Sequence, residues 1–504
     1  MSAFFRPQPR DSGSQEGGVL CLCLTEDTVE KDLSILEKYG AFADALELRV
    51  DCLAPAERGQ AGALLRHTHL PVILAVRRTK DGGRFEGGEP ERTALLDRLC
   101  AERFSFVDLE EDLAAPDLER AAQSKGCRII RSLYDASGVP QDLAARLRRL
   151  ARNPRELPKA AVYVAGTAEL LSLLEVFSRT RGMEKILLGT GETGICTRIL
   201  AYPLGSSLCY STMTKSPDLP GHEDPRTLVE LYRFRAIGEN TAVFGVTGNP
   251  VSHSLSPLIH NRGFAALGID GVYLPFPADD IGRMLQAARV LGVRGLSVTV
   301  PHKEAVLAFL SKTDALVKAV GACNTVLWDS CLEAWKGTNT DVEGFLAPLR
   351  GLYGGGILKG LRATVVGSGG AAKAVVYALA GQGADILVLG RTPDRARALA
   401  QTAKGRWAIL DDSAFSLMES YSDLIVQTTP IGMDPHPEMD PIPGYRFRGR
   451  EIVYDLVYTT SMTRMLSRAR EAGCRIIEGK QMLLAQAYPQ FELFCGRTYP
   501  GLDA

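Results

Sequence analysis

The chain has 504 residues, and at roughly 100–200 residues per domain this length predicts about three domains. Hydrophobic residues make up 45% and charged residues 23%, which is typical of a soluble globular protein, and no run approaches the roughly 18 apolar residues of a membrane-spanning helix. Lys and Arg number 58 against 59 Asp and Glu, so the net charge of -1 argues against nucleic acid or a membrane surface as a partner.

Residues 1–18 lack an apolar segment of the kind found in signal peptides, and they contain Asp11 and Glu16, so we expect a disordered leader. Eleven cysteines are scattered without a CxxC pair, which favours free thiols in a reducing, cytoplasmic setting. The seven histidines form no HExxH motif or Cys/His cluster, so no metal site is predicted. The sequence leaves the oligomeric state open.

From residue 19 the chain alternates short apolar runs with amphipathic segments of helical spacing. The eight runs cover residues 19–24, 45–50, 71–76, 104–109, 127–132, 159–164, 185–189 and 206–210. Eight repeats of strand and helix over about 200 residues predict a closed (β/α)₈ TIM barrel within residues 19–222. In such barrels the catalytic groups lie at the C-terminal ends of the strands.

Ionisable residues collect at those strand ends. Glu47, Arg49 and Asp51 are at the end of the second strand, Arg77 at the end of the third, and Asp108 and Glu110 at the end of the fourth. Lys159 opens the sixth run with apolar neighbours in sequence, and burial among apolar groups would lower the pKa of its amine and make it nucleophilic. A lone lysine at a strand start more often extends to solvent, but the surrounding charges favour a functional role.

The first half resembles type I 3-dehydroquinate dehydratase over residues 19–222. The resemblance depends on ELRVD at 47–51, LAVR and the following DGG within 74–83, Lys159, and GETGICTR at 191–198. It implies a Schiff base between Lys159 and the substrate ketone, after which a base removes the neighbouring proton. The implied substrate-binding residues are Glu47, Arg49, Arg77 and Arg198, whose guanidinium groups suit a carboxylate.

Three positions depart from the pattern of this family. The general base of the family is a histidine, whereas this chain has Tyr134 there, and a phenol with an ordinary pKa of about 10 is a poor base at pH 7. Asp81 stands for the family's glutamate, and residues 219–222 read Leu-Pro-Gly-His where the family has A-P-G-Q. We therefore expect weak or altered dehydratase activity with Schiff-base formation retained.

Residues 223–241 form a charged, helical connector to the second half. Residues 242–350 then place small polar groups after strand-like runs, in SLSP, SVTVPHK, GACNT and NTD. Ser254 and Ser256 are two residues apart, which suits either one polyol ligand or a helix cap. One lysine, one aspartate and several amides and hydroxyls at strand ends suit proton transfer on a polyhydroxylated substrate.

Residues 351–477 predict a Rossmann lobe that binds a dinucleotide. Gly367, Ser368, Gly369 and Gly370 lie between a strand and a helix, where backbone N–H groups can approach a pyrophosphate. The next strand ends in Arg391 and Thr392 rather than in the acidic residue of an NAD site, so NADP is favoured.

The second half resembles shikimate dehydrogenase across about residues 242–497. The matching motifs include SLSP, SVTVPHK, GACNT, NTD, VVGSGGAAKA, TTPIGM, DLVY and GKQMLLAQA. By position, the resemblance implies that Lys303 and Asp341 are the catalytic pair. It also implies that a C-terminal helix, 478–497, packs back against the substrate lobe. The implied substrate-binding residues are Ser254, Ser256, Thr299, Asn324, Tyr458 and Gln486, and the implied NADP-binding residues are Gly367, Ser368, Gly369, Gly370, Arg391, Thr392 and Met433.

The sequence thus predicts an α/β protein with an N-terminal TIM barrel and a two-lobed shikimate dehydrogenase. Its expected substrates are 3-dehydroquinate and 3-dehydroshikimate, with shikimate as the product, because the product of the first reaction is the substrate of the second. One alternative makes the barrel an inactive scaffold or binding module, which Tyr134 supports. A second alternative is quinate dehydrogenase, which the presence of both Ser254 and Ser256 makes less favoured.

Overall fold

The computed structural model of the chain describes residues 17–213, 223–353, 359–459 and 461–501. These residues form two compact units. Unit 1 lies within residues 1–245, 250–257 and 268–293, and unit 2 lies within 246–249, 258–267 and 294–504. The predicted leader, apart from its last two residues, and the departing motif at 219–222 lie outside the described residues.

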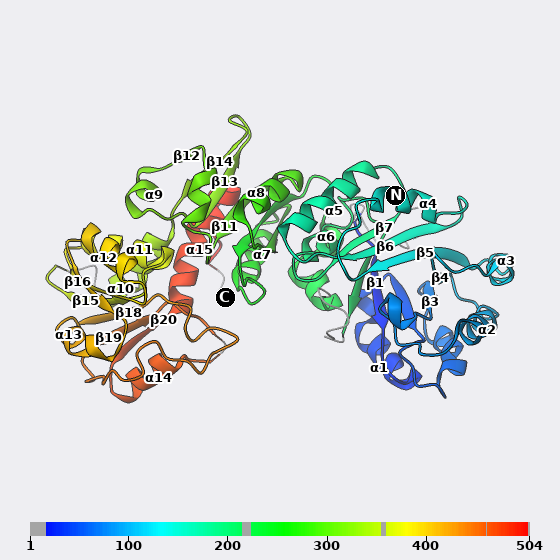
Figure 1. Cartoon of the computed structure of the whole chain (residues 1–504), viewed down its shortest axis with the longest axis horizontal. Helices are drawn as coiled ribbons and strands as arrows, with labels where there is room; N and C mark the ends of the chain where they lie inside the picture. Colours follow the sequence, from blue (N-terminus) through cyan, green and yellow to red (C-terminus); the bar gives the residue numbers. More distant parts are fainter. Residues whose placement is uncertain (1–16, 214–222, 354–358, 460, 502–504) are drawn as a thin grey trace. The chain divides into compact units, whose positions relative to one another are not determined.

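Unit 1 contains an eight-stranded barrel whose strands appear in blue to green in Figure 1. The strands are β1 (Leu20–Leu24), β2 (Ala45–Arg49), β3 (Val72–Ala75), β4 (Phe106–Glu110), β5 (Arg128–Asp135), β6 (Leu157–Tyr163), β7 (Ile186–Thr190) and β8 (Cys209–Thr212). Neighbouring strands from β7 through β1 to β8 pair in parallel. The predicted eight-stranded barrel is therefore confirmed.

The seam between β7 and β8 closes through residues that precede β8. The backbone N–H of Ser207 donates to the carbonyl of Lys185 at 2.7 Å. The backbone N–H of Leu187 donates to Oγ of Ser206 at 3.1 Å. Two hydrogen bonds from the run at 206–210 thus take the place of a longer ladder.

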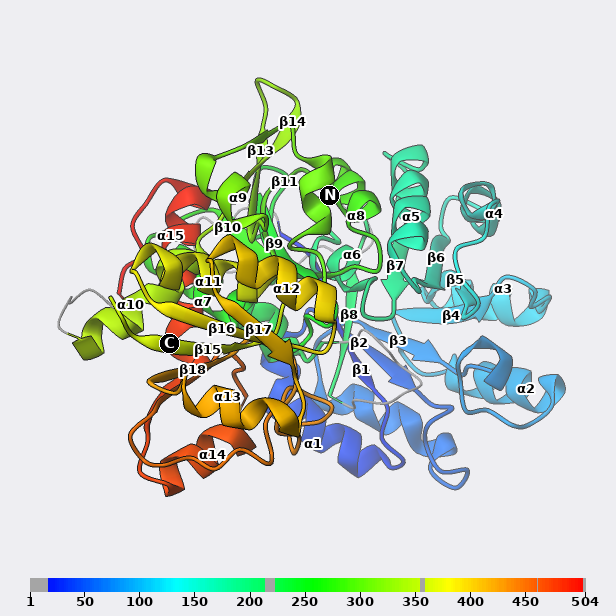
Figure 2. The same cartoon turned by 60° about the vertical axis from the view of Figure 1, so that its left-hand side comes forward.

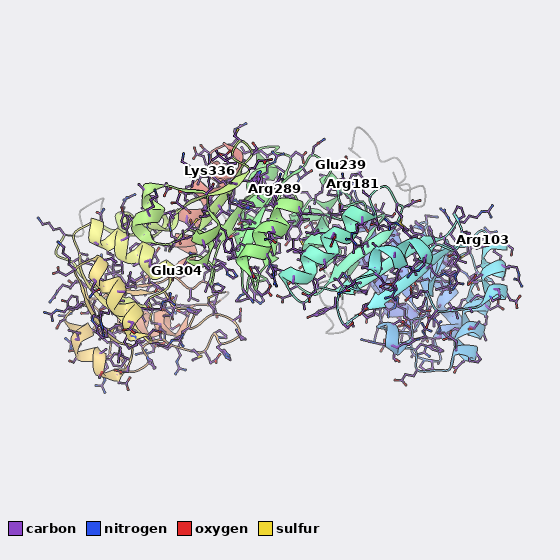
Figure 3. All side chains as sticks on the ribbon, turned by 45° about the horizontal axis from the view of Figure 1, so that its top comes forward. Arg103, Arg181, Glu239, Arg289, Glu304 and Lys336 are labelled. Carbon is purple, nitrogen blue, oxygen red and sulfur yellow. The ribbon has the colours of Figure 1, made fainter. Side chains whose placement is uncertain are left out.

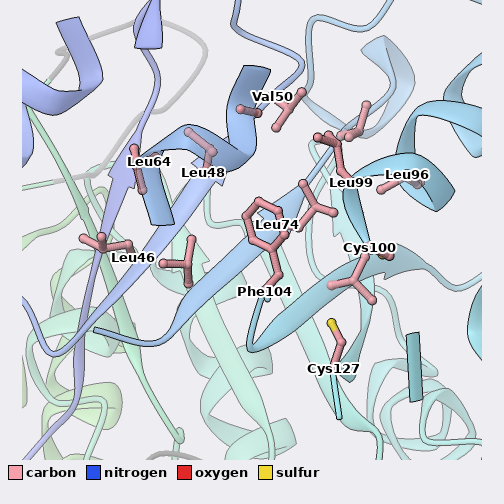
Figure 4. Close-up of a cluster of buried hydrophobic side chains, with 14 of the residues drawn as sticks. Leu46, Leu48, Val50, Leu64, Leu74, Leu96, Leu99, Cys100, Phe104 and Cys127 are labelled. Atoms are coloured by element: carbon pink, nitrogen blue, oxygen red, sulfur yellow. The ribbon is translucent and has the colours of Figure 1, made fainter. Parts of the chain in front are cut away.

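Helices follow the barrel strands and cover the outside of the barrel. They are α1 (Val29–Tyr39), the 3₁₀ helix η2 (Arg58–His67), α2 (Glu89–Leu99), α3 (Pro116–Ser124), α4 (Leu143–Leu150), α5 (Thr167–Arg179) and α6 (Ile195–Ile199). Outward-facing strand residues such as Leu46, Leu48 and Leu74 pack against helix residues such as Leu96 and Leu99 (Figure 4). This apolar layer holds the strands in register, so their inward-facing side chains converge in the barrel.

The chain then enters the predicted substrate lobe. Its strands are β9 (Ala242–Gly248), β10 (Gly271–Pro277), β11 (Val293–Val298), β12 (Lys312–Thr313), β13 (Thr325–Asp329) and β14 (Ala334–Thr338). Its helices are α7 (Ser256–Ala266), α8 (Ile281–Val290), α9 (Ala315–Val320) and α10 (Asp341–Tyr353). Within unit 2, β11 and β14 both pair antiparallel with β13, and β12 pairs parallel with β14.

The last sheet has the topology of a Rossmann fold. Its strands are β15 (Arg362–Val366), β16 (Asp385–Gly390), β17 (Arg406–Ile409), β18 (Leu424–Gln427), β19 (Ile452–Asp455) and β20 (Arg475–Glu478). All pair in parallel in the order β17-β16-β15-β18-β19-β20, which is the 3-2-1-4-5-6 order of dinucleotide-binding folds. The strand order reverses between β15 and β18, and such folds bind their ligands at this point.

Helices pack on both faces of this sheet (Figure 2). The helices α11 (Gly370–Gly381) and α12 (Pro393–Thr402) cover one face, and α13 (Phe415–Glu419) and α14 (Arg464–Glu471) cover the other. The final helix, α15 (Gly479–Cys495), also reaches the substrate lobe, where Gln490 donates to Oγ1 of Thr325 at 2.8 Å. None of the helices in the described segments is long and apolar enough to cross a membrane.

Two candidate active sites

The interior of the barrel has an apolar layer and a charged layer. The apolar layer consists of Val19, Cys21, Cys23, Ala45, Ile73, Phe106, Ile130, Leu157, Ile186, Leu188, Leu208 and Tyr210. Because successive inward-facing residues are two apart along a strand, the next inward positions on β2, β4 and β6 are Glu47, Asp108 and Lys159. These three side chains are all buried, so the charged layer is shielded from solvent.

Lys159 is held by two carboxylates. Its Nζ lies 2.8 Å from Oε2 of Glu47 and 2.8 Å from Oδ2 of Asp108. Its Nζ also lies 4.1 Å from the centre of the Tyr210 ring, on strand β8. The surrounding charges expected from the sequence are present, but the expected apolar surroundings of the amine are not, because the register brings acidic residues that are 51 and 112 positions away in sequence into contact with it.

Asp108 also binds a second cation. Nη2 of Arg77 lies 2.9 Å from the same Oδ2 that contacts Lys159. Burial acts to raise the pKa of Asp108, but Lys159 and Arg77 outweigh it and hold that pKa below its ordinary value. Asp108 is therefore an ionised group between two cations. Nε of Arg77 has no hydrogen-bond partner among the described residues.

Arg49 and Arg198 differ in how fully they are occupied. Arg49 binds Asp51 through Nε at 3.0 Å and Nη2 at 2.8 Å, and its Nη2 also donates to the carbonyl of Gly82. Arg198 donates from Nε to the carbonyl of Gly189 at 2.8 Å, and its buried Nη1 has no partner in the described part of the chain. Arg198 thus offers a free donor inside the barrel, whereas Nε and Nη2 of Arg49 are engaged by Asp51.

Tyr134 lies at the end of β5 and is half-buried. Its ring packs so closely on Gly82 that a Cβ there would lie 2.9 Å from Cε1 of Tyr134. Asp81 pairs with Arg78 at 2.5 Å. Arg198 lies within electrostatic range of the Tyr134 phenol. The position at which the family has its histidine therefore faces the same interior as Arg198.

Sequence reasoning missed Tyr210, and it noted Asp108 without assigning it a role. The apolar run at 206–210 ends at Tyr210. The sequence therefore predicts this ring at the end of a strand and does not indicate what it contacts. The strand begins only at Cys209, and its first pairs are with β1. The sequence does not show which residues of β8 face the barrel interior, and this becomes clear only from the register with β1.

The second candidate site lies in unit 2 around Lys303 and Asp341. Nζ of Lys303 lies 2.5 Å from Oδ2 of Asp341, which is the first residue of α10. A carboxylate in the first turn is favoured by the positive end of the helix dipole. Oδ1 of Asp341 accepts from Nδ2 of Asn324 at 2.8 Å, so both carboxylate oxygens are engaged. Lysine, aspartate and amide, predicted from three separate motifs, meet here.

The Asn324 amide orients this cluster. Its Nδ2 also donates to Oγ1 of Thr340 at 2.9 Å and, at 3.4 Å, to Oε1 of Gln486 on α15. Gln486 is buried and donates to the carbonyl of Leu483. Three of the predicted residues are thus joined in one network with Lys303.

The other predicted substrate residues lie next to or at the ends of regular elements. Oγ of Ser254 accepts from the backbone N–H of Ser256 at 3.2 Å at the start of α7, and both belong to unit 1. In unit 2, the backbone N–H of Thr299 donates to the carbonyl of Thr247 at 2.9 Å. Tyr458 follows β19 and is half-buried.

The segment after Lys303 contacts the Rossmann helices. Glu304, labelled in Figure 3, pairs with Lys373 of α11 at 2.8 Å and with Arg395 of α12 at 2.6 Å. A Cβ on Gly370, the first residue of α11, would lie 2.8 Å from Cβ of Lys303. The glycine-rich turn therefore lies directly against the lysine of the second site.

The turn after β15 has a backbone that requires glycine. Gly367 has a φ of 122°, and a Cβ there would meet Oγ1 of Thr428 at 2.3 Å. A Cβ on Gly369 would meet nothing within 4 Å, and α11 begins without a side-chain cap. The start of α11 thus presents backbone N–H groups on an open side, with Ser368 half-buried between the glycines.

The end of β16 is basic rather than acidic. Arg391 and Thr392 are exposed, and no ion pair to Arg391 occurs among the described residues, while Asp385 lies at the opposite end of the strand. Met433 is half-buried in the loop after β18, where its N–H donates to the carbonyl of Pro430. Arg391 is therefore available to bind an anionic group on the ribose of a dinucleotide, such as a 2′-phosphate.

Together, the fold and the two sites define a two-part enzyme with a lysine-centred barrel and a Rossmann lobe beside a Lys–Asp pair. Three family models match the chain. The type I 3-dehydroquinase model matches residues 20–239, the shikimate dehydrogenase substrate-binding domain matches 246–326, and the shikimate/quinate 5-dehydrogenase model matches 354–430.

The chain is similar to known proteins over its whole length and over its second half. A protein of Arabidopsis thaliana named bifunctional 3-dehydroquinate dehydratase/shikimate dehydrogenase, chloroplastic, is 31% identical, with 96% of this chain and 83% of that protein covered. Shikimate dehydrogenase (NADP(+)) of Moorella thermoacetica is 43% identical, with 52% and 90% covered. The crystal structure of shikimate 5-dehydrogenase from Thermus thermophilus in complex with NADP(H) and shikimate is 36% identical, with 51% and 95% covered and a TM-score of 0.45.

The chain belongs to the family of bifunctional 3-dehydroquinate dehydratase/shikimate dehydrogenases.

Proposed function

We propose that the barrel dehydrates 3-dehydroquinate to 3-dehydroshikimate through a Schiff base on Lys159, and that the second half reduces 3-dehydroshikimate to shikimate with NADPH. The observation that carries the first step is the position of Lys159, buried and 2.8 Å from two carboxylate oxygens. An amine must lose a proton before it attacks a carbonyl, and the carboxylate of Glu47 is an acceptor in contact with it.

The other residues of the barrel support the same reaction. The free donor of Arg198 suits the carboxylate of the substrate, and Arg77 adds a second positive charge nearby. Asp108 stays ionised and stabilises the cationic imine on Lys159. The imine withdraws electrons from the neighbouring carbon, so that loss of its proton and then of the hydroxyl becomes accessible. Glu47 and Arg49 complete the proposed substrate-binding set.

Tyr134 limits this reaction in our proposal, since a phenol replaces the imidazole at the position of the base. Replacing Tyr134 with histidine is expected to raise dehydratase turnover at pH 7 by about tenfold or more, because a positioned base contributes about 10²–10⁴-fold. Turnover is measured from the absorbance of the enone product.

The same Tyr134→His variant should leave NADPH oxidation with 3-dehydroshikimate unchanged, because that reaction depends on the other half. Wild-type dehydratase turnover equal to or above that of the variant would contradict the proposed limitation by Tyr134.

In the dehydrogenase half, the residues present fit NADP. The open start of α11, the close backbone at Gly367 and the unopposed Arg391 suit a pyrophosphate and a 2′-phosphate. Bound NADPH supplies a hydride. We further propose that Ser368, Gly369, Gly370 and Thr392 contribute to this site, with Met433 near the nicotinamide.

Lys303 is the proposed proton donor to the oxygen of the reacting ketone, and Asp341 orients it through the 2.5 Å contact. Asn324 and Gln486 hold the substrate hydroxyl groups as part of the same hydrogen-bond network. Ser254, Ser256, Thr299 and Tyr458 are proposed to complete the substrate site. The protein is proposed to be cytoplasmic, which agrees with its eleven free cysteine thiols.

One assay tests the whole proposal. Wild-type protein given 3-dehydroquinate and NADPH should oxidise NADPH after a lag and form shikimate, and NADPH should be preferred over NADH. NADPH oxidation only after addition of 3-dehydroshikimate would mean that the barrel is an inactive scaffold. Formation of quinate in place of shikimate would overturn the proposed substrate of the second half.

A further inference from the structure

Tyr210 has a buried hydroxyl group that the fold leaves without a partner. Its side chain is 4% exposed, and no group in the described residues forms a hydrogen bond with its Oη. Most buried polar groups in proteins have a partner, and leaving one without costs about 1–3 kcal/mol. A buried hydroxyl without a partner beside a charged site indicates that its hydrogen-bond partner is an atom of the bound ligand.

The ring of Tyr210 is already part of the site around Lys159. Its centre lies 4.1 Å from Nζ of Lys159, so the face of the ring contacts the ammonium group. The hydroxyl lies at the edge of the same ring. A ketone whose carbon is in contact with Nζ therefore lies in the surroundings of this ring.

The charges around Tyr210 keep its hydroxyl protonated. Burial raises the pKa of Tyr210 well above its usual value, and the negative charges of Glu47 and Asp108 raise it further. A phenol in these surroundings acts as a hydrogen-bond donor and not as a base. This distinguishes Tyr210 from Lys159, which must lose protons during the reaction.

We propose that the Tyr210 hydroxyl donates a hydrogen bond to the oxygen of the ketone that Lys159 attacks, and so acts as a catalytic residue in formation of the Schiff base. The inference depends on the proposed Schiff-base route. As the nitrogen lone pair forms the C–N bond, the π pair of the carbonyl moves onto its oxygen. A donor aimed at that oxygen stabilises the charge that develops there.

The step balances without any further reactant. The ammonium group of Lys159 carries three protons, two of which pass to the carbonyl oxygen, with Glu47 as the acceptor in contact with Nζ. The C–O bond then breaks, water leaves, and the nitrogen lone pair forms the C=N bond of a protonated imine. Tyr210 keeps its own proton throughout.

Tyr210→Phe in the full chain tests the proposal, since it keeps the ring face and removes only the hydroxyl. Wild type and variant are mixed with 3-dehydroquinate, samples are quenched with borohydride over time, and the adduct on the Lys159 peptide is measured by mass spectrometry. We expect the variant to form the adduct at least about tenfold more slowly, because removing one donor of this kind costs about 10²–10³-fold in other enzymes.

Tyr232→Phe is the matched control, because Tyr232 is also buried but lies in the connector beyond the barrel strands. This control should form the adduct within about twofold of the wild-type rate. KM for 3-dehydroquinate should change much less than the rate in Tyr210→Phe, whereas a loss of barrel packing would raise KM and lower the melting temperature together.

The outcomes separate the inference from the proposed function. No adduct in the wild-type protein overturns the Schiff-base route and the inference with it. An adduct in the wild type that forms equally fast in Tyr210→Phe overturns the inference alone. A slower rate that comes with a raised KM and a lowered melting temperature assigns Tyr210 to packing and also overturns it.

Discussion

Replacing Lys159 with methionine is expected to lower dehydratase turnover by at least about 10³-fold, because the covalent route is lost with the amine. Borohydride should then trap no substrate on the barrel. NADPH oxidation with added 3-dehydroshikimate should continue, since Lys303 and Asp341 are in the other unit. The two activities are measured on the same preparation, so each is the internal control of the other.

The methionine variant also leaves Glu47 and Asp108 without their shared cation. Breaking a buried ion pair from one side costs about 3–5 kcal/mol, and this loss alone could unfold the barrel. Lys159→Arg is the matched control, because a guanidinium group keeps the charge but does not deprotonate to form an imine. A folded Arg variant that keeps wild-type dehydratase turnover would rule out covalent catalysis by Lys159.

Replacing Lys303 with methionine is expected to lower the rate of 3-dehydroshikimate reduction by about 10²–10⁴-fold. The side-chain stem that packs against Gly370 is retained, so the glycine-rich turn should be undisturbed. KM for NADPH should therefore stay near its wild-type value while kcat falls. Steady-state NADPH oxidation at saturating substrate measures both quantities.

Lys336→Met is the matched control for this substitution. Lys336, labelled in Figure 3, lies on β14 in the same unit and pairs with Asp329 at the surface. Its loss should leave kcat within about twofold of wild type, because surface ion pairs contribute little. Equal rates for Lys303→Met and the wild type would remove Lys303 from the proposed proton transfer.

Much of the fold was predictable because each element carries a local pattern. The eight apolar runs of the barrel have the length of strands, and seven of them are followed by helical segments. The turn at Gly367 was recognisable because a strand precedes it and a helix follows. The strand order of the Rossmann sheet was not visible in the residues, since it depends on which strands pair.

The candidate site residues could be predicted from the sequence only where a residue stands in a recognisable motif. Lys159, Lys303 and Asp341 were identified from motifs, but their partners come from distant strands. The contact of Lys159 with Glu47 joins residues 112 apart, and no local pattern encodes that register. Tyr210 resembled any aromatic strand residue until pairing of β8 with β1 turned its ring toward Lys159.

The pairing of Lys159 with Glu47 and Asp108 has a consequence for the whole covalent cycle. The resting lysine is a cation, and the protonated imine proposed to form on it is also a cation at the same atom. The same two anions are therefore counter-ions to both species, and the net charge of the barrel interior is equal before and after the bond forms. A buried site that keeps a constant charge has little to reorganise between steps, so the rigid strands that carry Glu47 and Asp108 suit a reaction with several successive intermediates.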